Sequence, residues 1–143
     1  MNKLREVRDE KKLDNKGFSL VELIIVIAIM AVLIGVLAPQ YLKYVQKSRE
    51  SADLDSINTM IHAIEIYNAD PETTTPATGN ITAGAPVTVD PTIQTALTAS
   101  GMSTLPKMKS TEYASTWVIN FTTSGWSVTT ESANSKLATA LGR

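Results

Sequence analysis

The sequence predicts an α+β protein with a long N-terminal α-helix, membrane-spanning in its first half, and a small antiparallel β-sheet head packed on its second half. Three observations lead to this fold class. Residues 18–39 form an apolar run, residues 40–69 continue it as an amphipathic helical pattern, and two β-prone runs joined by a turn lie near residue 120. We therefore expect a leader at 1–17, a membrane helix at 18–39, a second helical half at 40–69 and a head at 70–143.

The leader is charged and has no apolar period. It holds six Lys or Arg against four acidic residues, a net +2, whereas the rest of the chain has seven against ten, a net −3. An excess of Lys and Arg before an apolar run is typical of the cytoplasmic side of a membrane span. The weakly acidic balance leaves contact with nucleic acid open but does not indicate it, because phosphate binding requires a clustered basic surface. The chain has no cysteine, which removes disulfides and thiol chemistry.

The apolar run of residues 18–39 is long enough to cross a bilayer, which takes roughly 20 residues of helix. Two alternatives were weighed. A buried core helix would need a larger remaining chain to surround it. A cleaved secretory signal would need small residues at its cut, but Ala38 is followed by Pro39 and the run ends without an A-x-A pattern. A membrane span fits best.

The second half of the helix carries one apolar stripe. Its members follow a 3-4-3 spacing, which places them on one face: Leu54, Ile57, Ile61 and Ile64. The acidic side chains nearby are expected to form a solvated face: Glu50, Asp53 and Asp55. Residues 40–70 contain no Gly or Pro, so we expect one helix from Phe18 to about Ala69, roughly 78 Å long.

The rest of the chain reads as a small β-rich head. Residues 70–91 are rich in Thr, Pro and Gly and predict a loop with one short strand at 86–89, and residues 92–100 predict a short helix. Residues 117–121 and 126–130 predict a hairpin. Alternation directs one face of each strand at the helix stripe, so the expected head core also contains Trp117, Ile119 and Trp126.

A carboxylate just inside the apolar run needs an explanation. Glu22 lies in the first helical turn, where the helix dipole favours an acid by about 0.3–1 kcal/mol. If the chain were cut between Gly17 and Phe18, the new amine of Phe18 could pair with Glu22 of a neighbouring molecule away from water. A wrong stagger would leave a buried unpaired charge, which costs several kcal/mol. We therefore expect Glu22 to set the register of packed helices.

These residues resemble the N-terminal segment of type IV pilins and of the related pseudopilins of type II secretion. The resemblance covers residues 16–41 and includes a proline twenty-two positions after the cut, here Pro39. It implies cleavage after Gly17 by a prepilin peptidase, N-methylation of Phe18, and assembly of many copies into a helical filament by an ATP-driven platform. It also implies a cytoplasmic-membrane precursor that becomes a surface filament for adhesion, twitching motility or DNA uptake.

Gly35 and Pro39 mark the weakest part of the predicted helix. The ring of Pro39 presses on the carbonyl of Gly35, and its missing N–H leaves that carbonyl without a helical partner. The resemblance adds that related filaments unwind this segment. We therefore expect a kink, or melting of residues 31–40 on assembly.

Other features support no separate activity. His62 is the chain's one histidine, so a metal site is not expected, and no cofactor or catalytic constellation is recognised; we predict a protein that is not an enzyme. Two sequons, at Asn80 and Asn120, are read as chance matches. The alternatives to a pilus subunit are a pseudopilin of a secretion or competence machine and, more remotely, an uncleaved single-span membrane-anchored binding domain.

Overall fold

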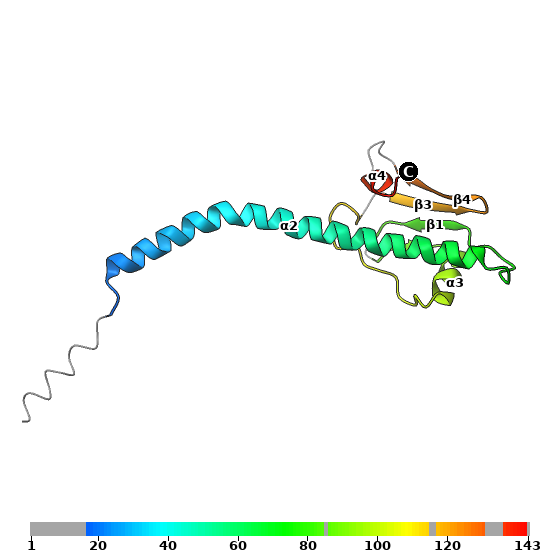
Figure 1. The fold of residues 1–143 in the computed structure, drawn as a ribbon, viewed down its shortest axis with the longest axis horizontal. Coiled ribbons are helices and arrows are strands. Elements are labelled where there is room, and N and C mark those ends of the chain that lie inside the picture. The colour runs from blue at the N-terminus through cyan, green and yellow to red at the C-terminus, as the bar shows by residue number, and fades with distance from the viewer. Residues whose placement is uncertain (1–16, 85, 115–116, 131–135, 143) are drawn as a thin grey trace, which may run out of the picture. The chain divides into compact units, whose positions relative to one another are not determined.

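The computed structural model describes residues 17–84, 86–114, 117–130 and 136–142, so the expected leader lies outside the described residues except for Gly17. Figure 1 shows the elements in chain order, and they are α2 (Leu20–Ala69), β1 (Gly79–Thr82), β2 (Thr88–Val89), α3 (Pro91–Ala99), β3 (Trp117–Thr122), β4 (Gly125–Thr130) and α4 (Lys136–Ala140). A long N-terminal helix and a small antiparallel sheet confirm the predicted α+β class. The chain divides into two compact units, Met1–Leu42 and Lys43–Arg143, which are described separately.

Helix α2 is unbroken through Pro39 and ends at Ala69, where the sequence placed its end. It begins at Leu20, two residues later than expected. Ser19 precedes it in a non-helical conformation and accepts the first helical hydrogen bond, from the N–H of Leu23 to the Ser19 carbonyl at 3.1 Å. The two residues that were expected in the helix but lie outside it are therefore Phe18 and Ser19, and Ser19 is the N-cap.

The head, in the second unit, is a four-stranded sheet in the order β2-β1-β3-β4 with every neighbouring pair antiparallel. Strands β3 and β4 form the expected hairpin, in which Thr122 lies opposite Gly125. Gly125 has a φ of 139°, a region open to glycine but rarely adopted by other residues. The side chain of Thr122 closes the turn by donating to the carbonyl of Gly125 at 2.9 Å.

The stretch read as a loop, residues 70–91, contains a strand that the sequence did not reveal. β1 lies in the interior of the sheet, with Ile81 paired to Val89 on one side and Ile119 on the other. Ile81 is fully buried but is the one large apolar residue of its four-residue strand, so no alternation could be recognised. The short helix α4, which buries Leu137, was likewise not predicted.

The head core lies between the second half of α2, the sheet and α3, which Figure 1 shows beside one another. Of the residues expected there, five are 0–3% exposed: Ile57, Ile61, Ile64, Trp117 and Ile119. Leu54 and Trp126 are only half-buried and pack against the edge of the core. Helix α2 also contributes Met60, which is fully buried. It lies four residues before Ile64, on the same face of the helix.

Asp53 corrects the sequence interpretation, because it is 2% exposed rather than solvated. Its carboxylate accepts hydrogen bonds from the backbone N–H of Lys109, at 2.9 Å to each oxygen, and from that of Ser110 at 2.7 Å. A buried carboxylate persists only where such donors replace water. Asp53 therefore fixes the segment before β3 onto α2, across 56 residues of sequence. Spacing along the helix could not reveal donors so distant in the chain.

Tyr113 lies in the same region and is 6% exposed. Its N–H donates to the Ser110 hydroxyl at 3.2 Å, and its carbonyl accepts from the indole of Trp117 at 2.9 Å. Burial, reinforced by the negative charge of Glu50, raises the pKa of the Tyr113 phenol. The phenol therefore stays neutral across the physiological range, as its surroundings require.

Asp53→Ala is expected to destabilise the head by about 3 kcal/mol, because it leaves the buried N–H groups of Lys109 and Ser110 without an acceptor. Thermal unfolding of the full chain in detergent, followed by circular dichroism, measures the loss. The matched control is Asp55→Ala, which removes an exposed acid two residues away. Equal melting temperatures for the two variants would show that the Asp53 hydrogen bonds do not hold the head together.

Candidate functional site

The start of α2 is closed by a reciprocal pair of hydrogen bonds. The backbone N–H of Ser19 donates to Glu22 Oε2 at 2.9 Å, and the N–H of Val21 donates to Ser19 Oγ at 3.3 Å. This is the capping box, in which Ser at the N-cap and Glu three residues later satisfy backbone donors that a helix start leaves open. The sequence analysis missed Ser19, although the Ser-x-x-Glu spacing before an apolar run was a readable signal.

The cap determines where the Glu22 carboxylate points. It reaches back along the helix to Ser19, the residue next to Phe18. Within the described part of the chain, Oε2 has this partner while Oε1 has none. A carboxylate offers about four acceptor positions, so Glu22 can cap its own helix and still accept a second donor.

The expected cut site lies in exposed chain without regular secondary structure, just before the cap. Gly17, Phe18 and Ser19 have no regular structure, and the Phe18 side chain is 93% exposed. A Cβ added to Gly17 would have no heavy atom within 4 Å. Among the described residues, the peptide bond between Gly17 and Phe18 is therefore exposed, and both capping partners lie on its C-terminal side.

The apolar surface of α2 in the first unit is uncovered. Its large apolar side chains between Leu20 and Leu37 are 50–75% exposed, and the most apolar window of the helix has a mean hydropathy of 3.1 with none of it buried. The helix is thus long and apolar enough to cross a membrane, and its most apolar window is not buried in a protein core. Uncovered apolar surface of this extent needs lipid or other protein around it.

Gly35 and Pro39 both lie inside α2 in this structure. A Cβ at Gly35 would have open space around it, so no close contact requires glycine there. The continuous helix is that of a single chain. Unwinding of residues 31–40 in an assembled filament stays a prediction.

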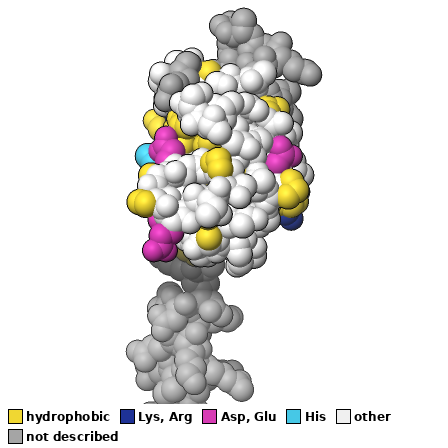
Figure 2. All heavy atoms as spheres, turned by 90° about the vertical axis from the view of Figure 1, so that its right-hand side faces the viewer, with side chains coloured by type: hydrophobic (Ala, Val, Ile, Leu, Met, Phe, Trp, Pro, Cys, Tyr) yellow, Lys and Arg dark blue, Asp and Glu magenta, His cyan; other side chains and the backbone are white. Residues whose placement is uncertain are grey.

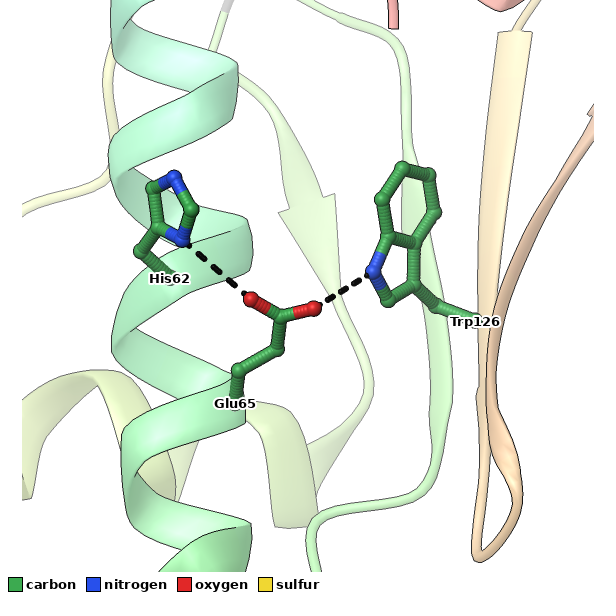
Figure 3. A network of polar contacts seen from close by, with 3 residues as sticks. All are labelled: His62, Glu65 and Trp126. Carbon is green, nitrogen blue, oxygen red and sulfur yellow. Dashed lines mark hydrogen bonds and ion pairs between the residues drawn. The ribbon is translucent and has the colours of Figure 1, made fainter. Parts of the chain in front are cut away.

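A surface network joins α2 to β4 in the head (Figure 3). The Glu65 carboxylate accepts from the Trp126 indole N–H at 2.8 Å and lies 3.2 Å from His62 Nδ1. The side chains of His62 and Glu65 are 72% and 47% exposed. This explains why Trp126 is only half-buried: its nitrogen requires a polar partner, and Glu65 supplies one at the edge of the core.

The remaining candidates are the histidine and the two sequon asparagines of the head. Over the described residues no group of three or more His, Asp or Glu side chains could hold a metal ion. Asn120, in β3, donates its side-chain amide to Asn80 in β1 at 2.8 Å, so the two sequon residues are partners in the sheet.

Two comparisons with known proteins found similar sequences. Residues 12–38 match the family described as "Prokaryotic N-terminal methylation motif". The chain is also 42% identical over 50 residues to two proteins named "Type IV major fimbrial protein FimA" from Dichelobacter nodosus. The chain is therefore similar to type IV fimbrial proteins over 50 residues and carries a match to the methylation motif at residues 12–38. No solved structure matches the chain.

The pilin likeness extends over a limited part of each chain. The alignment covers 35% of this chain and 32% of the Dichelobacter proteins, so it spans about a third of the relatives' length. The family match places Gly17, Phe18, Ser19 and Glu22 inside the methylation motif. The head is therefore described from its own residues.

Proposed function

We propose that this chain is the precursor of a structural subunit of a type IV pilus. A prepilin peptidase removes residues 1–17 on the cytoplasmic side and methylates the amine of Phe18. The helix holds the subunit in the cytoplasmic membrane until an assembly platform and its ATPase move it into a helical filament of identical subunits. The surface filament then serves adhesion, twitching motility or DNA uptake.

The observation that carries this proposal is the arrangement at the start of α2. An exposed peptide bond precedes a capped helix, the apolar residues 20–39 of that helix are uncovered, and the one acid among them, Glu22, lies in the first turn with one carboxylate oxygen available for a second partner. Cutting between Gly17 and Phe18 removes neither capping partner, because Ser19 keeps its N–H and hydroxyl. The mature helix therefore begins as well ordered as the precursor helix.

In this proposal, charge pairing selects one stagger between neighbouring helices, which apolar contacts alone do not. Leu, Ile and Val pack acceptably at many staggers, whereas a buried charge needs its partner at one. In the proposed filament the methylated amine of Phe18, which keeps its positive charge, meets Glu22 of a neighbouring subunit. Coulomb attraction is far less screened there than in water. Subunits at a wrong stagger leave both charges unpaired and are rejected.

Mass spectrometry of the protein from sheared surface filaments tests the proposal. We expect filaments whose subunit begins at Phe18 and carries one methyl group on its amine. A subunit that still begins at Met1 and is found in membranes would indicate a membrane-anchored binding domain instead. Correctly cut subunits confined to the cell envelope of a secreting cell would indicate a pseudopilin.

A further inference from the structure

The charges of the head divide between the two ends of the second half of α2. Residues 43–50 carry three basic side chains, all exposed, against the half-buried Glu50: Lys43, Lys47 and Arg49. Residues 62–72 contain no Lys or Arg and carry three exposed acids: Glu65, Asp70 and Glu72. Each head therefore has a basic end and an acidic end.

The acidic end also has a groove. It has a volume of about 950 Å³ and lies between the last turns of α2, the residues that follow them and the end of α3. Its lining includes Thr59, Ala63, Ile66, Tyr67, Asp70 and Ala99. Ile66 is 71% exposed, although it lies among the buried residues of α2 in sequence. Figure 2 looks onto this end of the head and shows acidic side chains on the face, with basic colour confined to its edge.

The basic end presents an exposed aromatic side chain. Tyr44 is 70% exposed and lies three residues before Lys47, so the two share a helix face. Tyr44 and Ile66 are 22 residues apart on one helix, a distance of roughly 33 Å. A head therefore cannot fill its own groove with its own tyrosine.

We propose that the Ile66 groove of one subunit receives the Tyr44–Lys47 stretch of a second copy of the chain. This rests on the proposed function, since it makes the heads of a filament touch one another. The tyrosine ring covers Ile66, and Lys47 lies near Asp70 of the other copy. The two surfaces differ, so each subunit uses both and the contact repeats along the filament without closing. A second copy is the favoured occupant because one chain supplies the apolar anchor and both signs of charge.

Cross-linking in assembled filaments tests this contact, and the absence of native cysteine makes the result specific. The full chain carries Ser48→Cys together with Ala69→Cys, two exposed positions beside the contact that leave Tyr44 and Ile66 in place, and surface filaments are treated with a short bismaleimide. We expect a ladder of dimers, trimers and larger multimers on a denaturing gel. Either single variant, and Asp55→Cys paired with Ala69→Cys, should give monomers.

A charge reversal provides the second measurement. Lys47→Glu, at an exposed position, should lower the cross-linked fraction about fivefold by bringing like charges together. Adding Asp70→Lys to Lys47→Glu should restore the cross-linked fraction to within about twofold of its original value. Adding Asp55→Lys instead should leave the fraction at its lowered value.

The outcomes separate this contact from the filament itself. Abundant filaments that give only monomers in the double-cysteine variant would overturn the head contact and leave the pilus proposal standing. An equal cross-linked fraction with lysine and with glutamate at position 47 would also overturn the head contact. If the wild-type chain forms no filaments, the pilus proposal and the head contact fail together.

Discussion

Glu22→Val is expected to lower surface filament yield about a hundredfold or more while the precursor is still cut between Gly17 and Phe18. The valine adds apolar surface and suits the membrane, so insertion should improve. Assembly should fail because the Phe18 amine of each neighbouring subunit loses its acid, and an unpaired buried charge costs about 3–5 kcal/mol. Sheared filaments and processed subunit in the membrane, measured by immunoblot, provide the two readouts.

The capping role of Glu22 must be separated from the pairing role, because valine removes both. Glu22→Gln does this: glutamine also serves in a capping box, so the hydrogen bond from Ser19 N–H can persist while the charge is lost. If charge pairing sets the register, Gln should fail as badly as Val. Ser19→Ala is the complement, since it weakens the cap by about 1 kcal/mol and keeps the acid.

Pairing therefore predicts poor filaments from Glu22→Gln and near-normal filaments from Ser19→Ala. The reverse result would mean that Glu22 acts through the order of its own helix start. Wild-type filament yield from Glu22→Val would contradict both roles.

The structure also shows which interactions can be predicted from the sequence. The helix stripe and the β3–β4 hairpin were recognisable because each repeats a local period over several residues. Strand β1 was not, since Ile81 is its one large apolar residue and its pairing depends on strands distant in sequence. The burial of Asp53 could not be predicted for the same reason, because its partners are distant in sequence. Helix spacing suggested a solvated acid, whereas its hydrogen-bond donors lie 56 and 57 residues away.

The candidate functional residues also fall into those that local sequence can predict and those that it cannot. Gly17, Phe18 and Glu22 were predicted from a short local motif and its resemblance to type IV pilins, and Ser19 could have been predicted too, because a capping box is local. The groove at Ile66 could not, because it forms only where the ends of α2 and α3 come together. The N-terminal helix can therefore be predicted well from the sequence, whereas the surface of the head cannot.

Gly17→Val is expected to slow removal of the leader about a hundredfold, so that precursor accumulates in the membrane. The free chain offers no reason for the effect, because a Cβ at Gly17 has no heavy atom within 4 Å and the residue precedes the helix. The defect should arise in the peptidase, where glycine lets the backbone enter the cleft without a side chain. A displacement of about 1 Å at a scissile bond can cost about a hundredfold in rate.

Pulse labelling followed by immunoprecipitation measures this rate, since precursor and mature chain differ by the 17 leader residues. Gly17→Ala should give a smaller delay than Val, because the obstruction grows with the side chain. Gly35→Ala is the matched control: its Cβ also meets open space, but it lies inside α2, so processing should keep its normal rate. Wild-type processing of Gly17→Val would mean that the cut does not depend on this glycine, and the assignment of the cleavage site would have to move.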